Sequence, residues 1–76
     1  MTPAEQHERR LARARRDLER VAQSAQTARN EDLLARLTVD ASTMVVDARN
    51  GLFPYHSRAL DLLEECVIEW RKYHGQ

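Results

Sequence analysis

Cysteine, glycine and proline are scarce in this 76-residue sequence, which has one, two and two of them. A single cysteine excludes an internal disulfide, and a free thiol is typical of a reducing compartment. Two separated glycines, Gly51 and Gly75, exclude a glycine-rich phosphate-binding loop. The three histidines lie far apart in the sequence and no cysteine pair accompanies them. We therefore expect neither a metal nor another cofactor.

Long hydrophobic runs are also missing. The sequence has no run of about 18 apolar residues, and its first residues lack the basic-then-apolar order of a signal peptide. We therefore expect a cytoplasmic protein without a membrane partner.

The chain is short for a stable domain, and residues 1–76 are expected to fold as one unit. A domain of this size buries only about 60% of the surface of its unfolded chain. Since neither a disulfide nor a metal is expected to support the core, a second copy of the chain is the expected support. The sequence therefore predicts a homo-oligomer.

The longest helical pattern begins at Thr2, which can cap a helix that Pro3 opens and whose capping box Glu5 completes. Neither glycine nor proline follows before Asn30. The pattern predicts a helix over about 3–28, longer than the others. Its apolar residues recur every three or four positions, as along one side of a helix: Ala4, His7, Leu11, Ala14, Leu18, Val21, Ala25 and Ala28. The alanines would let another helix come close, and Leu11, Leu18 and Val21 would supply the buried area, so we predict an oligomer or partner interface at these three residues. The alternative is that they pack against the other two helices of the same chain, although no such partner is expected for the part around Ala4 to Leu11.

The middle of the sequence permits two interpretations. Asn30 can cap a helix over about 31–49, and the pair Asn50-Gly51 can end it. Five β-branched residues within this range favour strands instead, and a β-hairpin across Asp40–Thr43 is the alternative. The apolar period is nearer 3.6 than 2, so we predict the helix.

A third helix is predicted over about 55–74, and it is apolar over much of its circumference. Such a helix is usually buried on more than one side. Among the aromatic residues, Phe53 and Trp70 are expected in the core, whereas Tyr55 and Tyr73 are candidate interface residues. The predicted fold is therefore all-α: a three-helix antiparallel array with a long N-terminal helix, which assembles as a helical-bundle homodimer.

Positive charge is concentrated near the N-terminus. Residues 1–30 hold seven arginines and four acids, a net charge of +3, while residues 31–76 hold five basic and eight acidic residues, a net charge of −3. We call Arg9, Arg13, Arg16 and Arg20 the arginine stripe, because their spacing places them on one face of the first helix. The stripe could contact nucleic-acid phosphates or an acidic protein, or it could be a solvated face neutralised by nearby acids.

Catalytic signals are weak. The glutamates of the third helix have no histidine at the spacing of a helical metal motif, and Cys66 lies within an apolar face where an inert, packed thiol is expected. Four acids on that helix also disfavour a helix-turn-helix DNA-binding motif. We predict a non-enzymatic protein-interaction module, a regulator, adaptor or inhibitor that acts through helical surfaces. The alternative is a dimeric nucleic-acid-binding regulator that uses the arginine stripe.

Overall fold

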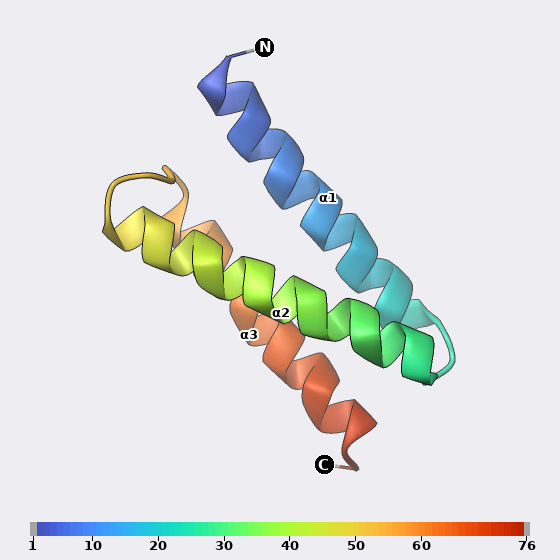
Figure 1. Ribbon diagram of the computed structural model, residues 1–76. Coiled ribbons are helices and arrows are strands. Elements are labelled where there is room, and N and C mark those ends of the chain that lie inside the picture. The colour runs from blue at the N-terminus through green and yellow to red at the C-terminus, as the bar shows by residue number, and fades with distance from the viewer. Residues whose placement is uncertain (1, 76) are drawn as a thin grey trace.

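The computed structural model describes residues 2–75, and three helices account for most of them (Figure 1). The helices are α1 (Pro3–Gln23), α2 (Ala28–Arg49) and α3 (His56–Tyr73). No strand occurs among the residues described. The three helices pack together, so the all-helical prediction is confirmed.

Helix α1 begins where the sequence predicts. The Thr2 side chain accepts a hydrogen bond from the Glu5 backbone N–H at 3.2 Å, which satisfies one of the free N–H groups of the first turn. The helix ends at Gln23, so the predicted range of 3–28 is too long. With 21 residues, α1 is not longer than α2, which has 22.

Short polar side chains explain this earlier break. The Ser24 hydroxyl donates to the Arg20 carbonyl at 2.7 Å, and the Thr27 hydroxyl accepts from the Asn30 backbone N–H at 3.2 Å. The Asn30 side chain then donates to the Ala25 carbonyl at 2.8 Å. The Arg20 carbonyl also accepts the last backbone bond of α1, from the Ser24 N–H at 3.1 Å. The bonds of Thr27 and Asn30 take the place of backbone bonds that a continuous helix would form, so residues 24–27 form the connection and α2 begins at Ala28, earlier than predicted.

Helix α2 is continuous through Asp40–Thr43, so the alternative β-hairpin is wrong. Two of its β-branched residues bond back to the preceding turn: Thr38 donates to the Leu34 carbonyl at 2.8 Å and Thr43 to the Val39 carbonyl at 3.0 Å. After the helix, Gly51 adopts a φ of 79°, a conformation that favours glycine.

The core lies between the three helices. Figure 1 shows α2 lying beside α3, whereas α1 diverges from α2 toward its N-terminus. Most contacts between helices accordingly join α2 and α3. All three helices and the connection after α2 supply buried side chains: Leu11, Ala14, Leu18, Val21, Leu34, Leu37, Ala41, Met44, Val45, Phe53, Ala59, Leu62 and Cys66.

Candidate functional site

Three of the predicted interface residues lie inside the molecule. Leu11, Leu18 and Val21 are 0%, 6% and 2% exposed, and they pack in the core of the single chain. The first part of α1 also has a partner within the chain, because the His7 ring packs edge-on against Phe53 with 5.2 Å between ring centroids. These side chains are therefore not part of the surface that the folded chain offers to a partner.

The two tyrosines expected at an interface are half-buried. Tyr73 packs against the core, and its hydroxyl is buried without a hydrogen-bond partner in the part of the chain that the structure describes. Tyr55 lies at the start of α3, edge-on to Phe53 at 5.6 Å between ring centroids. Phe53 is buried, as predicted, while Trp70 is partly buried and packs against the core.

A small polar cluster joins the N-terminal part of α1 to the start of α3. The Arg58 guanidinium donates to the Glu8 carboxylate at 2.9 Å and lies 4.8 Å from the centre of the Tyr55 ring. Hydrogen bonding to Arg58, and then to Tyr55, lowers the pKa of Glu8 below 4.5. The same carboxylate raises the pKa of Tyr55 above 10 and the pKa of Arg58. The Glu8 and Arg58 side chains are about half exposed, so their ion pair contributes little to stability.

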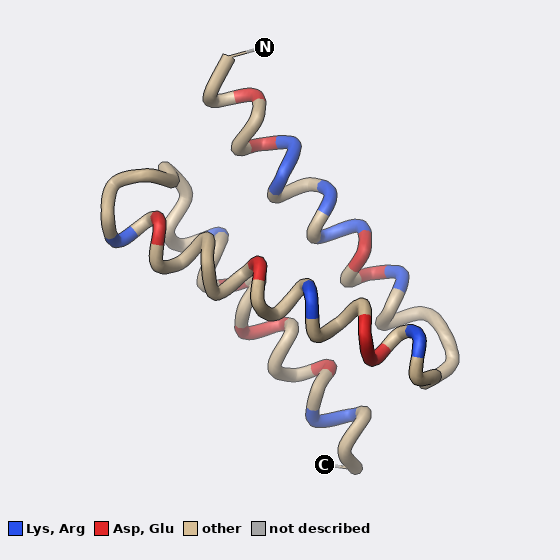
Figure 2. Tube along the Cα trace, in the orientation of Figure 1, with Lys and Arg blue, Asp and Glu red and all other residues tan. Residues whose placement is uncertain are grey.

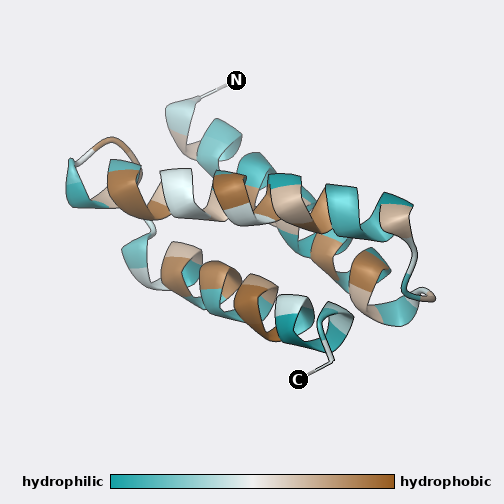
Figure 3. Ribbon diagram, turned by 60° about the horizontal axis from the view of Figure 1, so that its bottom comes forward, coloured by the Kyte–Doolittle hydropathy of each residue, from teal (hydrophilic) through white to brown (hydrophobic). Residues whose placement is uncertain are grey.

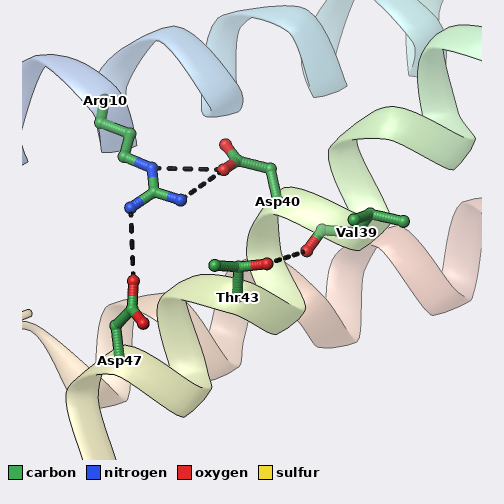
Figure 4. Close-up of polar contacts among 5 residues, drawn as sticks. All are labelled: Arg10, Val39, Asp40, Thr43 and Asp47. Atoms are coloured by element: carbon green, nitrogen blue, oxygen red, sulfur yellow. Dashed lines mark hydrogen bonds and ion pairs between the residues drawn. The ribbon is translucent and has the colours of Figure 1, made fainter. Parts of the chain in front are cut away.

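Other ion pairs fix α1 against its neighbours. Arg10 donates to the Asp40 carboxylate of α2 at 2.6 Å, and a guanidinium nitrogen lies 3.9 Å from Asp47 (Figure 4). Arg15 donates to Glu65 of α3 at 2.9 Å. The side of α2 that carries Asp40 and Asp47 is therefore the side that faces α1 (Figure 4). Val39 borders that side, because it lines a hollow of about 430 Å³ together with Arg10 and Asp40.

The arginine stripe is exposed on α1, and none of its four members forms an ion pair with the residues described. The sequence suggests ion pairs between the stripe and the acidic residues of α1, but none forms among the residues described. Glu8, one of those acids, pairs with Arg58 of α3 instead. Figure 2 shows basic residues recurring along α1. Further arginines of α2 join the stripe at its C-terminal end, where a cleft of about 570 Å³ is lined by Arg20, Arg29 and Arg36 together with Asn30, Asp32 and Leu33.

Large hydrophobic side chains are exposed elsewhere. Two lie on α2, Val39 at 67% exposure and Val46 at 54%. Leu52, in the connection after α2, is also exposed. On α3, the exposed fractions are 36% for Leu60, 39% for Val67 and 50% for Ile68. A shallow hollow of about 340 Å³ runs along α2 and is lined by Thr38, Val39, Ser42, Thr43 and Val46. Val39 and Val46, two of the β-branched residues that favour strands in the sequence, are thus exposed on the surface of a helix.

No three histidine, cysteine, aspartate or glutamate side chains of residues 2–75 come together as a metal site would require. Cys66 is fully buried, and burial raises the pKa of its thiol. No described helix combines the length and hydrophobicity needed to cross a bilayer.

Comparison of the chain with protein-family models, with curated proteins and with solved structures finds no match.

Proposed function

We propose that this chain is a non-enzymatic protein-interaction module, a regulator, adaptor or inhibitor that acts through helical surfaces as a homo-oligomer. In this proposal its helices form an antiparallel array, and two copies join into a helical-bundle dimer. The buried free thiol of Cys66 fits a reducing, cytoplasmic environment.

The observation that carries the proposal is the set of exposed hydrophobic side chains on α2 and α3. The core is formed without them, so they contribute little to folding of the isolated chain. Single exposed apolar residues are ordinary, but several side chains on two adjacent helices mark an interaction surface. Val39 and Val46 lie two helical turns apart on α2, and Leu60 and Val67 have the same spacing on α3.

Affinity capture tests this proposal. The chain is immobilised and exposed to an extract of the cells that express it, beside the double variant Val39→Ser/Val67→Ser. We expect a bound protein that survives nuclease treatment and is lost with the double variant. The matched control Leu52→Ser replaces a hydrophobic side chain as exposed as Val39 but outside the helices, and it should retain that protein. Capture of nucleic acid alone would contradict the proposal.

The unpaired arginine stripe favours a second candidate function, a dimeric nucleic-acid-binding regulator. Arg10 and Arg15 are held by acids of other helices, whereas Arg9, Arg13 and Arg16 form no ion pair within residues 2–75. Free guanidinium groups on one helix face match the phosphates of a nucleic-acid backbone.

Fluorescence anisotropy with a labelled DNA duplex and a labelled RNA tests this second function across a salt series. Binding through the stripe would weaken steeply with salt, because each contacted phosphate releases counterions. Replacing Arg9, Arg13, Arg16 and Arg20 by glutamine would flatten the salt dependence, while Arg71→Gln on α3 serves as the control. Salt-independent binding, or none, would exclude this function.

A further inference from the structure

Two clefts adjoin each other between α1 and α2. The first, of about 470 Å³, is lined by residues between positions 6 and 17 of α1 and between 37 and 40 of α2. The second, of about 570 Å³, is lined by Arg20 of α1 and by residues between positions 29 and 36 of α2. On both helices the second cleft begins within one turn of the first. We call the two clefts together the α1–α2 groove.

Arginines without an ion pair line this groove. Helix α1 contributes three members of the arginine stripe, and α2 contributes two more arginines. All five are exposed, and none forms an ion pair with another described residue: Arg9, Arg13, Arg20, Arg29 and Arg36. Figure 2 shows basic residues on both helices near the connection that joins them. The groove thus gathers guanidinium groups from two helices, whereas Arg16, the fourth member of the stripe, does not line it.

The acids of the groove balance these arginines only in part. Asp40 lines the first cleft, but it binds Arg10 of the same cleft, so that pair is neutral. Asp17 and Asp32 are the other acids, and no further charged side chain of the described residues lines either cleft. Five unpaired arginines and two carboxylates give the groove a net charge of +3, although the formal net charge of the chain is zero. We therefore expect an anionic ligand.

The floor of the groove is apolar. Ala14 and Leu37, core residues with 3% and 6% exposure, reach the first cleft, and the partly buried Leu33 reaches the second. The aliphatic parts of the arginine side chains add to this apolar surface. Figure 3 accordingly shows hydrophobic residues interspersed with hydrophilic ones along α1 and α2. A ligand that carries apolar groups beside its anionic groups matches both the floor and the walls.

We propose that the α1–α2 groove binds an acidic amphipathic helix of a partner protein. The carboxylates of that helix pair with the free guanidinium groups, and its apolar side chains pack on the floor between them. Arg9 and Arg20 lie about 17 Å apart along α1, so about three turns of the partner helix span the groove. This inference rests on the proposed function, since it names the chemistry of the protein partner.

The lining of the groove favours an acidic helix over a nucleic-acid strand. Proteins bind single strands by stacking bases on aromatic side chains, and no aromatic side chain of the described residues lines either cleft. A strand also carries a phosphate at every nucleotide, so it places negative charge beside Asp17 and Asp32. A peptide can instead place uncharged or basic side chains beside those two acids.

Fluorescence anisotropy with a labelled synthetic peptide tests the inference. The peptide forms about four helical turns from about 14 residues, with leucine at every third or fourth position and glutamate or alanine elsewhere. We expect the wild type to bind it. Arg13→Gln/Arg36→Gln removes one arginine from each wall of the groove, and the loss of two exposed ion pairs should weaken binding about tenfold.

The matched control is Arg49→Gln/Arg71→Gln, which removes two exposed arginines outside the groove that likewise form no ion pair with a described residue. This variant has the same net charge as Arg13→Gln/Arg36→Gln, and it should bind the peptide as the wild type does. Circular dichroism should show equal helix content in both variants, since all four positions are exposed.

Absence of peptide binding by the wild type would overturn the inference, as would an equal loss of affinity in both double variants. Tighter binding of a labelled single-stranded DNA, lost in Arg13→Gln/Arg36→Gln, would also overturn it and assign the groove to nucleic acid. A protein captured through Val39 and Val67 would still support the proposed function after any of these results. Failure of that capture, with peptide binding intact, would instead defeat the proposed function alone.

Discussion

At the scale of single residues, a few charged side chains link the three helices at their surface. Arg10, Arg15 and Arg58 each bind a carboxylate of another helix, and every one of these pairs is partly exposed. Exposed ion pairs contribute only about 0–1 kcal/mol each, because water screens them. Their effect on the pKa of the carboxylate is therefore easier to measure than their effect on the free energy of unfolding.

The Glu8 carboxyl provides the first prediction. Replacing Arg58 by glutamine removes the main cause of its lowered pKa, so the pKa of Glu8 should rise toward 4.5. Because the folded-state pKa is lowered, the contribution of Glu8 is complete above 4.5 and is lost as the pH falls through the lowered value. A nuclear magnetic resonance titration of the Glu8 side-chain carboxyl carbon measures this. Arg15→Gln, whose partner is Glu65, should leave the pKa of Glu8 unchanged.

The buried hydroxyl of Tyr73 gives a second prediction. It has no hydrogen-bond partner among the described residues, and an unsatisfied buried polar group costs about 1–3 kcal/mol. Tyr73→Phe should therefore raise the free energy of unfolding by about 1 kcal/mol, as measured by urea denaturation. Tyr55→Phe is the matched control and should give no gain, because the Tyr55 hydroxyl is not a buried group without a partner. A loss of stability in Tyr73→Phe would show that its hydroxyl does have a partner.

At the scale of helices, the sequence predicts which segments are helical better than where they end. The third helix is predicted within one residue at each end, because Pro54 and Gly75 flank it. The end of α1 is missed because residues 24–27 contain neither glycine nor proline, and the alanines at 25 and 28 continue the apolar spacing. Local hydrogen bonds of Ser24 and Thr27 determine where α1 ends. The same residues could continue the helix almost as readily, so the sequence pattern does not reveal its end.

The cap of α2 gives a prediction at this scale. Thr27→Ala removes the side-chain acceptor for the Asn30 backbone N–H, and loss of such a cap costs about 1 kcal/mol. The free energy of unfolding from urea denaturation should fall by that amount. Thr43→Ala is the matched control. Its hydroxyl bonds only the preceding turn of an exposed helix face, and alanine is the better helix former, so stability should hold or rise slightly. Equal losses in both variants would contradict a capping role for Thr27.

At the scale of the whole molecule, α1 covers one side of the α2–α3 pair and leaves the other side open. The unpaired arginines gather around α1, and the exposed hydrophobic side chains of the helices lie on α2 and α3. The sequence predicts surplus apolar surface on the first and third helices. It assigns the interface to Leu11, Leu18 and Val21 of the first helix, together with Tyr55 and Tyr73. Leu11, Leu18 and Val21 are core residues because the shorter α1 folds back onto the other helices. Which apolar side chains remain exposed depends on how the helices pack, and the sequence of one helix alone does not predict this packing.

The dependence of the thermal midpoint on protein concentration tests the central claim most directly. If two copies associate through exposed hydrophobic side chains of α2 and α3, unfolding also separates them, and by mass action the Tm of the wild type rises with concentration. We expect a rising Tm across a roughly hundredfold concentration series for the wild type and a constant Tm for Val39→Glu. A wild-type Tm that stays constant across the series, equal to that of Val39→Glu, would contradict it.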